Sequence, residues 1–334
     1  MRGSIGSGLR PAERHCKLQI GNCKLAIGCS YHKEARMTGR RYIVVVNPQS
    51  GRRQGLAVLE AVRPVFAAAG AALDVRISAS AGDVTEFAAT ADLSGCAGFC
   101  VVGGDGTVHD AVNGLMRRGQ PGAVPLGVIP SGTGNSLAEH VSCVDPLDAA
   151  RRIIAGKVGP LDVVRVSMGS QTAYCINIVG WGCAVDINRT AERLRLLGMP
   201  RYTLAALWHI LRARRRRAQV TLDGAVLDDS FLMVVGCNTK FTGKRMNLAP
   251  RADVGDGELD LVIVRRATRL QMLRMFRGIF DGSHVALPCV EYHRVRSFAI
   301  VPHRDELLNL DGELRGGTPV AAEIMPAALR LFTA

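Results

Sequence analysis

The chain has 334 residues, of which 48% are hydrophobic and 21% charged, and its formal net charge is +13 at pH 7. This composition excludes an intrinsically disordered chain, and the length is sufficient for two domains with cores of their own. The positive charge favours acidic partners such as phosphates, nucleic acid or an anionic membrane surface, without choosing among them.

The N-terminal segment differs from the rest of the chain. Residues 1–36 hold seven basic residues and two glutamates, and they contain the near-repeat CKLQIGN followed by CKLAIGC. Two short units cannot bury a core, and lysines interrupt the apolar stretch that a signal peptide would need. The cysteines also lack the CxxC spacing of zinc sites. We therefore expect residues 1–37 to be a disordered leader or a mis-called start, with Met37 as the functional start.

The remaining cysteines are scattered among apolar segments, as reduced core thiols usually are. They are Cys96, Cys100, Cys143, Cys175, Cys183, Cys237 and Cys289. This pattern predicts a reducing, cytoplasmic environment. The sequence contains no run of about 18 apolar residues, so no transmembrane helix is expected.

From residue 41 onward, short apolar runs alternate with helical patterns. Strands are predicted at residues 41–48, 73–78, 98–104 and 125–130, and helices at residues 55–69, 81–91, 107–117, 135–140 and 146–155. Continuous apolar strands separated by helices are typical of a parallel sheet that is covered on both faces. We therefore predict an α/β domain with a mostly parallel sheet over residues 38–158.

The pattern changes near residues 155–160, where we place the linker. Strands are predicted at residues 161–168, 171–182, 218–224, 230–238, 257–266, 296–302 and 308–314, and helices only at residues 190–217 and 269–280. Short strands separated by turns such as Asp-Gly indicate a mainly antiparallel domain, at residues 159–320. Residues 321–334 are expected to form a C-terminal strand that returns toward the first domain.

Three polar glycine turns follow strands of the first domain. They are NPQSG at residues 47–51, GGDGT at residues 103–107 and SGTGN at residues 131–135. Consecutive parallel strands end at one edge of the sheet, and backbone N–H groups in such turns bind phosphate. Asp105 would there serve as a magnesium ligand or as the base for an attacking hydroxyl. The alternative is a set of ordinary turns that need glycine for its backbone freedom.

Two common nucleotide motifs are missing from the sequence. Neither GxxxxGK[ST] nor GxGxxG occurs, which disfavours the P-loop and Rossmann folds. The ordered set NPxSG, GGDGTxxxxxNGL and PSGTGNxxA instead resembles the diacylglycerol kinase catalytic-domain family, which includes bacterial lipid kinases, ceramide kinases and sphingosine kinases. In the second domain, residues 180–204, FTGKRMNLAPRADVGDGELDL and LNLDGEL are similar to the sphingosine kinase branch. The resemblance extends from Arg41 to the C-terminus.

The resemblance implies a first domain like that of phosphofructokinase and NAD kinase, and a β-sandwich domain that binds the lipid. It implies an ATP·Mg²⁺ site, with Asp105 as the general base and Glu313 of the DGE motif closing the site. In bacterial members the DGE carboxylates are themselves candidates for the base. The nucleotide-binding residues carried over are Asn47, Ser78, Gly103, Gly104, Gly106, Thr107, Asp110, Ser131, Gly132, Thr133, Gly134, Asn135, Arg195 and Arg201.

One position departs from the sphingosine kinase pattern. The resemblance places Asp186 and Asn188 at the substrate, where sphingosine kinases carry a second aspartate for the ammonium group. An asparagine donates and accepts hydrogen bonds but gives no charge to an ammonium ion. The motif-level similarity favours a sphingoid-type lipid kinase. This position allows two alternatives, a neutral acceptor such as diacylglycerol or a ceramide-like lipid, or a sphingoid base whose amine binds Asp186.

A further loop is similar to one that holds a structural magnesium in some bacterial members. It contains Asp253, Asp256 and Asp260, with Asp256 as the metal-ligand candidate. A plain Asp-Gly hairpin turn is an equally good interpretation. The arginine run at residues 212–217 is expected to be a solvated face, with contact to anionic headgroups as the alternative. The histidines show no ligand spacing and are expected to be structural or exposed.

Together these features predict an ATP-dependent lipid kinase that phosphorylates a primary hydroxyl of a sphingoid base, a diacylglycerol or a related lipid. Its expected partners are ATP, Mg²⁺, the lipid substrate and, peripherally, a membrane, with no nucleic acid. A homodimer is one alternative for the assembly. The competing functions are an NAD kinase-like enzyme and a non-catalytic lipid-binding protein on the same fold.

Overall fold

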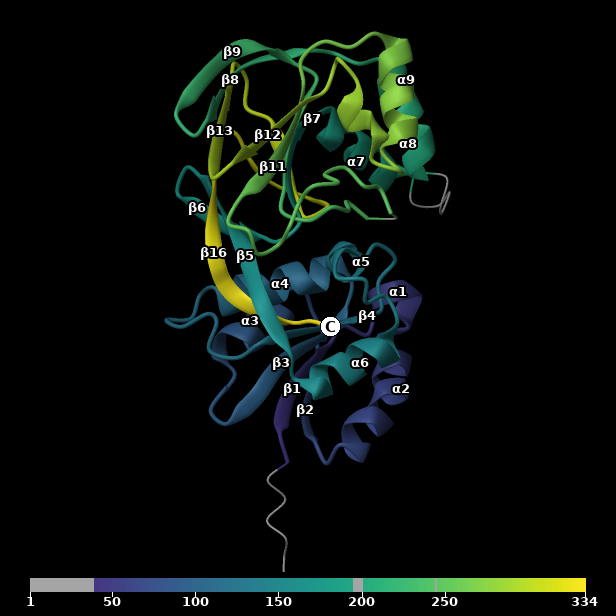
Figure 1. Ribbon diagram of the computed structural model, residues 1–334, viewed down its shortest axis with the longest axis vertical. Coiled ribbons are helices and arrows are strands. Elements are labelled where there is room, and N and C mark those ends of the chain that lie inside the picture. The colour runs from purple at the N-terminus through teal and green to yellow at the C-terminus, as the bar shows by residue number, and fades with distance from the viewer. Residues whose placement is uncertain (1–38, 195–200, 244) are drawn as a thin grey trace, which may run out of the picture. The chain divides into compact units, whose positions relative to one another are not determined.

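The computed structural model describes residues 39–194, 201–243 and 245–334 (Figure 1). Contacts within the chain group Thr38–Ala334 into one compact unit. The predicted leader, residues 1–37, lies outside the described residues. No helix among the described residues is long and apolar enough to cross a membrane.

The first half of this unit contains a parallel sheet in the order β2-β1-β3-β4. Its strands are β1 (Arg41–Val46), β2 (Ala72–Ile77), β3 (Cys96–Gly103) and β4 (Leu126–Pro130), and its helices are α1 (Ser50–Arg53), α2 (Gly55–Ala68), α3 (Asp83–Thr90), α4 (Asp105–Leu115), α5 (Ser136–His140) and α6 (Pro146–Ala155). This arrangement confirms the predicted α/β domain.

Successive side chains of β1 point to opposite faces of the sheet, and helices cover both faces. Val44 and Val46 pack in one core cluster with side chains from α2 and α6. Ile43 and Val45 point to the opposite face and pack with side chains from α3 and α4. Because both faces are buried, the strand needs a continuous apolar run rather than an alternating one.

The second half is mainly antiparallel, as predicted. A six-stranded sheet has the order β12-β11-β10-β7-β14-β15. Its strands are β7 (Ile178–Gly182), β10 (Met233–Cys237), β11 (Leu259–Val264), β12 (Glu291–Val295), β14 (Leu307–Leu310) and β15 (Glu313–Gly317). Trp181 and Leu261 of this sheet share a core cluster with Val220 and Phe298 of the other sheet, so the two sheets form a sandwich.

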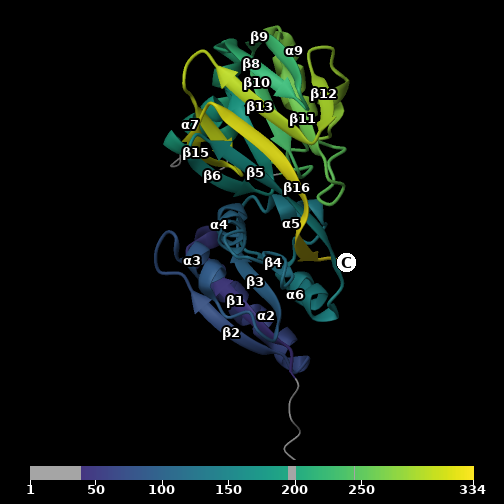
Figure 2. The ribbon, with the colours of Figure 1, turned by 90° about the vertical axis from the view of Figure 1, so that its left-hand side faces the viewer.

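The other sheet of the sandwich continues the parallel sheet of the first half. Beyond β4 its order is β16-β13-β8-β9, with β5 and β6 attached to β16. The strands are β5 (Val158–Met168), β6 (Gln171–Cys175), β8 (Arg216–Leu222), β9 (Ala225–Phe231), β13 (Ser297–Pro302) and β16 (Val320–Phe332). The long β16 pairs antiparallel with β5 and parallel with β4 at Leu331, and it is the yellow strand in Figure 2.

Four predicted elements of the second half are wrong. The strands expected at residues 230–238 and 308–314 each span parts of two strands, β9 and β10 in the first case and β14 and β15 in the second. The strand expected at residues 171–182 is two strands, β6 and β7, which belong to different sheets. The helix expected at residues 190–217 starts earlier, as α7 (Cys183–Arg193), and continues as α8 (Arg201–Leu211). It cannot extend to residue 217 because Arg216 is the first residue of β8, where its guanidinium binds two carboxylates. The second predicted helix is confirmed as α9 (Arg269–Gly278).

Candidate active site

The three glycine turns meet at the carboxyl edge of the parallel sheet. A Cβ atom on Gly51 would overlap the carbonyl oxygen of Ser131, and one on Gly132 would overlap the Cα of Gly104. The hydroxyl oxygens of Ser50 and Ser131 lie 2.6 Å apart. Glycine is therefore required here because backbone meets backbone, and the three turns form one continuous polar surface.

Asp105 lies at the junction of two of these turns, as the first residue of α4. Its Oδ1 accepts a hydrogen bond from the backbone N–H of Ser136 at 2.7 Å, and its Oδ2 accepts one from the Ser136 hydroxyl at 3.3 Å. Any side chain at Gly134 would collide with the same carboxylate. The GGDGT turn thus supplies Asp105, and the SGTGN turn and its continuation hold it in place.

The environment of Asp105 favours proton transfer near neutral pH. Burial raises the pKa of this carboxyl to about 6, and the charges of Asp311 and Glu139 act in the same direction, against the hydrogen bonds from Ser136. A base is most effective when its pKa lies close to the working pH. The geometry therefore suits the predicted role of Asp105.

The other predicted residues of the first half surround the same turns. Asn47 donates to the hydroxyl of the buried Thr107 at 3.1 Å, which ties the first turn to the second. Ser78 lies at the end of β2, where its hydroxyl donates to the carbonyl oxygen of Val46. Asn135 closes the third turn through two hydrogen bonds with Gly132, and Thr133 is exposed at its tip.

Glu313 approaches the start of α4 from the second half. Its Oε1 lies 2.8 Å from the place that a Cβ of Gly106 would occupy. Arg315 binds Glu313 at 2.8 Å and reaches Asp110 of α4 at 3.4 Å. The structure thus brings Glu313 and Asp110 together through Arg315, a residue that the sequence analysis missed because its partner lies 205 positions away.

Asp311, the first carboxylate of the DGE motif, is fully engaged inside the protein. It is 5% exposed and accepts hydrogen bonds from the backbone N–H groups of Ile176, Asn177 and Ile178 at 2.8 to 3.1 Å. Its Oδ2 also lies 2.8 Å from Nδ1 of the buried His109. Of the two DGE carboxylates considered as a base, only Glu313 is accessible, because Asp311 has no free lone pair toward a substrate.

His109, Asp311 and Cys175 form the one cluster in the described part of the chain with metal-ligand geometry. Asp311 already accepts three backbone hydrogen bonds and lies 2.8 Å from Nδ1 of His109, so its lone pairs are engaged without a metal. His109 and Asp311 are therefore joined in a buried hydrogen-bond network, in agreement with the structural role expected for the histidines.

The predicted substrate residues lie on α7. Asn188 donates to the carbonyl oxygen of Gly312 at 2.5 Å, next to Glu313. Asp186 binds Arg216 at 2.5 Å, and Arg216 also binds Glu306 at 2.8 Å. The charge of Asp186 is thus compensated within the protein, and Arg216 is not part of a solvated face as the arginine run predicted.

The roles of Arg195 and Arg201 as phosphate ligands stay predictions. Arg201 is the first residue of α8 and lies 3.5 Å from Glu192. Arg195 lies outside the described residues.

The proposed structural magnesium does not fit the loop that contains Asp253 and Asp256. Each of these carboxylates accepts a backbone hydrogen bond two residues ahead, as in a plain Asp-Gly turn. Asp256 also forms an ion pair with Arg294, which binds Glu258 at 2.7 Å as well. Asp260 is buried in β11, and burial raises its pKa. An internal guanidinium therefore neutralises the loop where a metal ion would be needed.

Chelation is expected to leave the stability of this loop unchanged. Because Arg294 supplies the positive charge, EDTA should not shift the melting temperature of the ligand-free protein in differential scanning fluorimetry. Arg294→Ala should lower it by an amount equivalent to about 1 kcal/mol, because two carboxylates lose their partner. Arg165→Ala is the matched control, since Arg165 is also 47% exposed but pairs only with Glu323. A fall of several degrees in the melting temperature when EDTA is added would show that the loop holds a metal.

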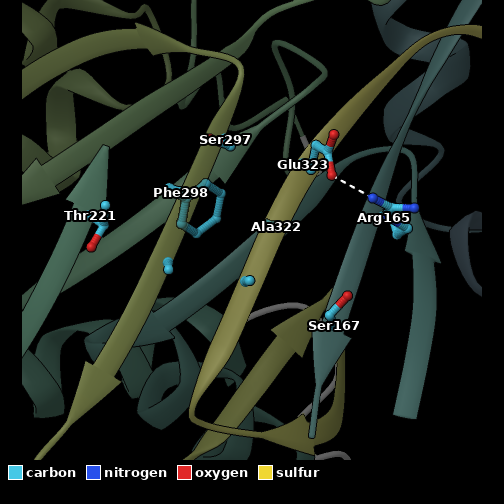
Figure 3. Close-up of a pocket in the computed structure, with 9 residues that line it drawn as sticks. Arg165, Ser167, Thr221, Ser297, Phe298, Ala322 and Glu323 are labelled. Atoms are coloured by element: carbon cyan, nitrogen blue, oxygen red, sulfur yellow. Dashed lines mark hydrogen bonds and ion pairs between the residues drawn. The ribbon is translucent and has the colours of Figure 1, made fainter. Parts of the chain in front are cut away.

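A separate depression of about 170 Å³ lies on the outer face of β5, β16, β13 and β8 (Figure 3). Arg165 and Glu323 form an ion pair of 2.6 Å along its rim, and small side chains such as Ser167 and Ala322 form much of its lining. It includes none of the predicted site residues that the structure describes, so it is not the active site.

Comparison with known proteins agrees with this architecture. Residues 41–166 match the model of the diacylglycerol kinase catalytic domain, and residues 177–333 match the YegS C-terminal NAD kinase beta sandwich-like domain. A putative diacylglycerol kinase from Bacillus anthracis str. Sterne superimposes with a TM-score of 0.71 at 24% identity, covering 88% of this chain and 97% of its own. The fold is thus that of a two-domain lipid kinase.

Curated relatives extend the match to function. Diacylglycerol kinase of Mycobacterium tuberculosis (strain ATCC 25618 / H37Rv) is 30% identical over 77% of this chain and 83% of its own length. A probable lipid kinase YegS-like of Chromohalobacter salexigens is 31% identical over 79% and 84%, and sphingosine kinase 1 of Arabidopsis thaliana is 24% identical over 85% and 70%. The chain belongs to the diacylglycerol kinase catalytic-domain family and is an ATP-dependent lipid kinase, which confirms the family predicted from the motifs.

Proposed function

We propose that this kinase transfers the γ-phosphate of ATP to the primary hydroxyl of a neutral lipid of the diacylglycerol class. The observation that carries the reaction is the position of Asp105 between two backbone turns, with a pKa raised to about 6 by burial. In the proposed reaction the Asp105 carboxylate accepts the proton of the lipid hydroxyl as its oxygen attacks the γ-phosphorus. The bond from that phosphorus to the bridging oxygen breaks, and ADP leaves with the electron pair.

The three turns serve as the phosphate-binding surface in this proposal. Backbone N–H groups and hydroxyls of the NPQSG, GGDGT and SGTGN turns would hold the nucleotide, since close backbone approach is what the glycines permit. Residues 38–158 would form the ATP-binding domain, and residues 159–320 would bind the lipid. Arg195 and Arg201 stay the predicted phosphate ligands from the second domain.

The carboxylates around the turns fit a catalytic magnesium ion. Burial raises the pKa values of Asp105 and Asp110, and Glu313 lies beside Asp110, so the site holds three hard oxygen donors. The guanidinium of Arg315 pairs with Asp110 and Glu313, and Asp105 has no salt bridge with a described residue. Mg²⁺ held by Asp110 and Glu313 would neutralise charge on the transferred phosphoryl group. Arg315 keeps these two carboxylates in position.

The acceptor is inferred from the charges near α7. Asn188 carries no charge, and Asp186 is neutralised by Arg216, so no described carboxylate of this pair is available for an ammonium group. A sphingoid base would leave its charge uncompensated there, whereas a diacylglycerol needs only hydrogen-bond partners. Contact with a membrane, a cytoplasmic location and a homodimer stay predictions.

The test is transfer of labelled phosphate from ATP to a panel of diacylglycerol, monoacylglycerol, ceramide and sphingosine in detergent micelles. We expect the highest kcat/KM with diacylglycerol and the lowest with sphingosine. A preference for sphingosine would contradict the inference from Asp186 and Asn188. Transfer to none of these lipids, by protein that is folded and binds ATP, would contradict the proposed function.

A further inference from the structure

Helix α8 exposes an apolar stripe. Its exposed large side chains occur at spacings of three and four residues, so they lie along one side of the helix. They are Leu204 (47% exposed), Leu207 (37%), Trp208 (49%) and Leu211 (56%). Ala205, Ala206 and Ile210 on the other side are buried. Both sides of the helix are therefore apolar, which is unusual for a surface helix.

Helix α9 shows the same arrangement beside α8. Leu270 is 58% exposed and Leu273 is 38% exposed, and Phe280 just beyond the helix is 50% exposed. The two helices lie against each other (Figure 1) and bury Ile210 and Met275 in one core cluster. Because both bury their inner sides in that cluster, their apolar outer sides are presented away from the protein core.

This concentration of apolar side chains is local. The described part of the chain has 14 exposed large hydrophobic residues. Seven of them lie on α8, on α9 or at Phe280 just beyond α9. Scattered exposed hydrophobics need no explanation, but a contiguous set marks an interaction surface. We call these seven residues the α8–α9 surface.

The segments that carry the α8–α9 surface are strongly basic. Residues 201–217 and 265–280 contain eleven arginines and no Asp or Glu. Seven of these arginines are exposed and form no salt bridge with a described residue: Arg212, Arg214, Arg215, Arg266, Arg269, Arg274 and Arg277. The guanidinium of Arg212 stacks over the ring of Trp208 at 4.1 Å, which places a cation at the edge of the apolar stripe.

We propose that the α8–α9 surface docks the protein onto a lipid bilayer that carries anionic headgroups. Leucine, tryptophan and phenylalanine side chains enter the boundary between headgroups and acyl chains, while arginines bind lipid phosphates. Complementary charge decides for this occupant, because seven exposed arginines without a salt bridge to a described residue repel a second copy of the same surface. The proposal rests on the proposed function, since a lipid acceptor has to be taken from a membrane.

Helix α8 contacts α7, the helix that carries the residues proposed to meet the lipid. The hydroxyl of Thr190 on α7 lies 2.7 Å from Nε2 of His209 on α8. The same helix α7 carries Asn188, which binds the carbonyl oxygen of Gly312 beside Glu313. A bilayer held against α8 is therefore one helix away from the residues proposed to meet the lipid.

Binding is measured by cosedimentation with phosphatidylcholine vesicles, with and without phosphatidylglycerol. We expect binding to the anionic vesicles that weakens as salt is raised. The chain has only two tryptophans, and Trp181 is fully buried, so Trp181→Phe leaves Trp208 as a reporter. Brominated lipids should quench its fluorescence. No binding to anionic vesicles, or binding without quenching, would overturn the proposal.

Matched variants separate docking from catalysis. Trp208→Glu with Leu211→Glu should weaken vesicle binding about tenfold or more, and Arg214→Glu with Arg215→Glu should remove the preference for anionic lipid. The first control is Val226→Glu with Val301→Glu, at positions that are 56% and 47% exposed. The second is Arg117→Glu with Arg151→Glu, at exposed positions after α4 and on α6. These should bind as wild type does.

Activity on a short-chain, water-soluble diacylglycerol distinguishes the two proposals. The docking variants should keep this activity and lose only activity on vesicle-embedded substrate. Loss of vesicle binding with retained soluble activity supports docking. Unchanged vesicle binding in the Trp208→Glu and Leu211→Glu variant overturns docking, even if that variant changes the oligomeric state seen in analytical ultracentrifugation. Failure to phosphorylate any soluble or embedded lipid would contradict only the proposed function.

Discussion

Asp105→Asn should lower kcat by a factor of about 10² to 10⁴, the usual contribution of a general base. The asparagine has the same shape as the aspartate, and its side-chain oxygen can still accept the 2.7 Å hydrogen bond from the N–H of Ser136. The two turns should therefore stay in place, and the variant should retain its fold and its affinity for ATP. Steady-state kinetics with diacylglycerol, together with ATP binding by calorimetry, would measure both quantities.

The pH dependence of the wild type gives a second signature of the same residue. Because the pKa of Asp105 is raised to about 6, kcat/KM should increase as pH rises through that value, and the Asp105→Asn variant should lack this step.

The free energy of unfolding should change with pH in the opposite sense to the activity. A carboxyl whose folded pKa lies above its ordinary value of 3.8 stabilises the fold at low pH, and this contribution is lost as pH rises through about 6. The variant should therefore gain stability relative to wild type over that interval.

Glu313→Gln is the control that separates the two candidate bases. Glu313 is accessible and lies near Gly106, so it is the alternative if Asp105 only positions the turns. If Asp105 is the base, Glu313→Gln should keep the step near pH 6 and lose activity mainly through weaker magnesium binding. A larger fall in kcat for Glu313→Gln than for Asp105→Asn, with loss of the pH step, would reverse the assignment.

The first half of the fold could be predicted because its signals are local. Continuous apolar runs at β1, β3 and β4, each followed by a glycine turn and a helical pattern, indicate a parallel sheet without any knowledge of distant residues. The same turns predicted that Asp105 would lie at the sheet edge. The pattern could not show that its carboxylate is held by Ser136, because that contact joins two turns 31 positions apart.

The second half was predicted less well because pairs distant in sequence determine it. The break between β6 and β7 lies where the N–H groups of residues 176–178 bind Asp311, more than 130 positions later. Arg216 likewise ends the helical pattern by binding Asp186 and Glu306, 30 and 90 positions away. Local periodicity contains no information about either partner.

The buried position of Asp311 leads to the largest expected effect on stability. Three backbone N–H groups and His109 converge on one carboxylate that is almost completely buried, and together they hold β7, β14 and α4. Asp311→Ala leaves all of these groups without a partner, so the free energy of unfolding should fall by about 3 to 5 kcal/mol. Chemical denaturation followed by circular dichroism would measure the loss.

Two further variants test whether the network, and not the position alone, carries this stability. Glu313 lies only two residues away, but its side chain is 43% exposed, so the free energy of unfolding of the Glu313→Gln variant should stay within about 0.5 kcal/mol of wild type. His109→Gln removes one partner and should cause a smaller loss of stability, which is measurable even if Asp311→Ala does not fold.

Burial lowers the pKa of His109, but its hydrogen bond and charge interaction with Asp311 raise it overall above 6.5. A raised histidine pKa stabilises the fold below pH 6.5, and the contribution is lost as pH rises through the folded value. The stability gap between wild type and His109→Gln should therefore narrow at alkaline pH, and a gap that widened instead would show that His109 acts in its neutral form.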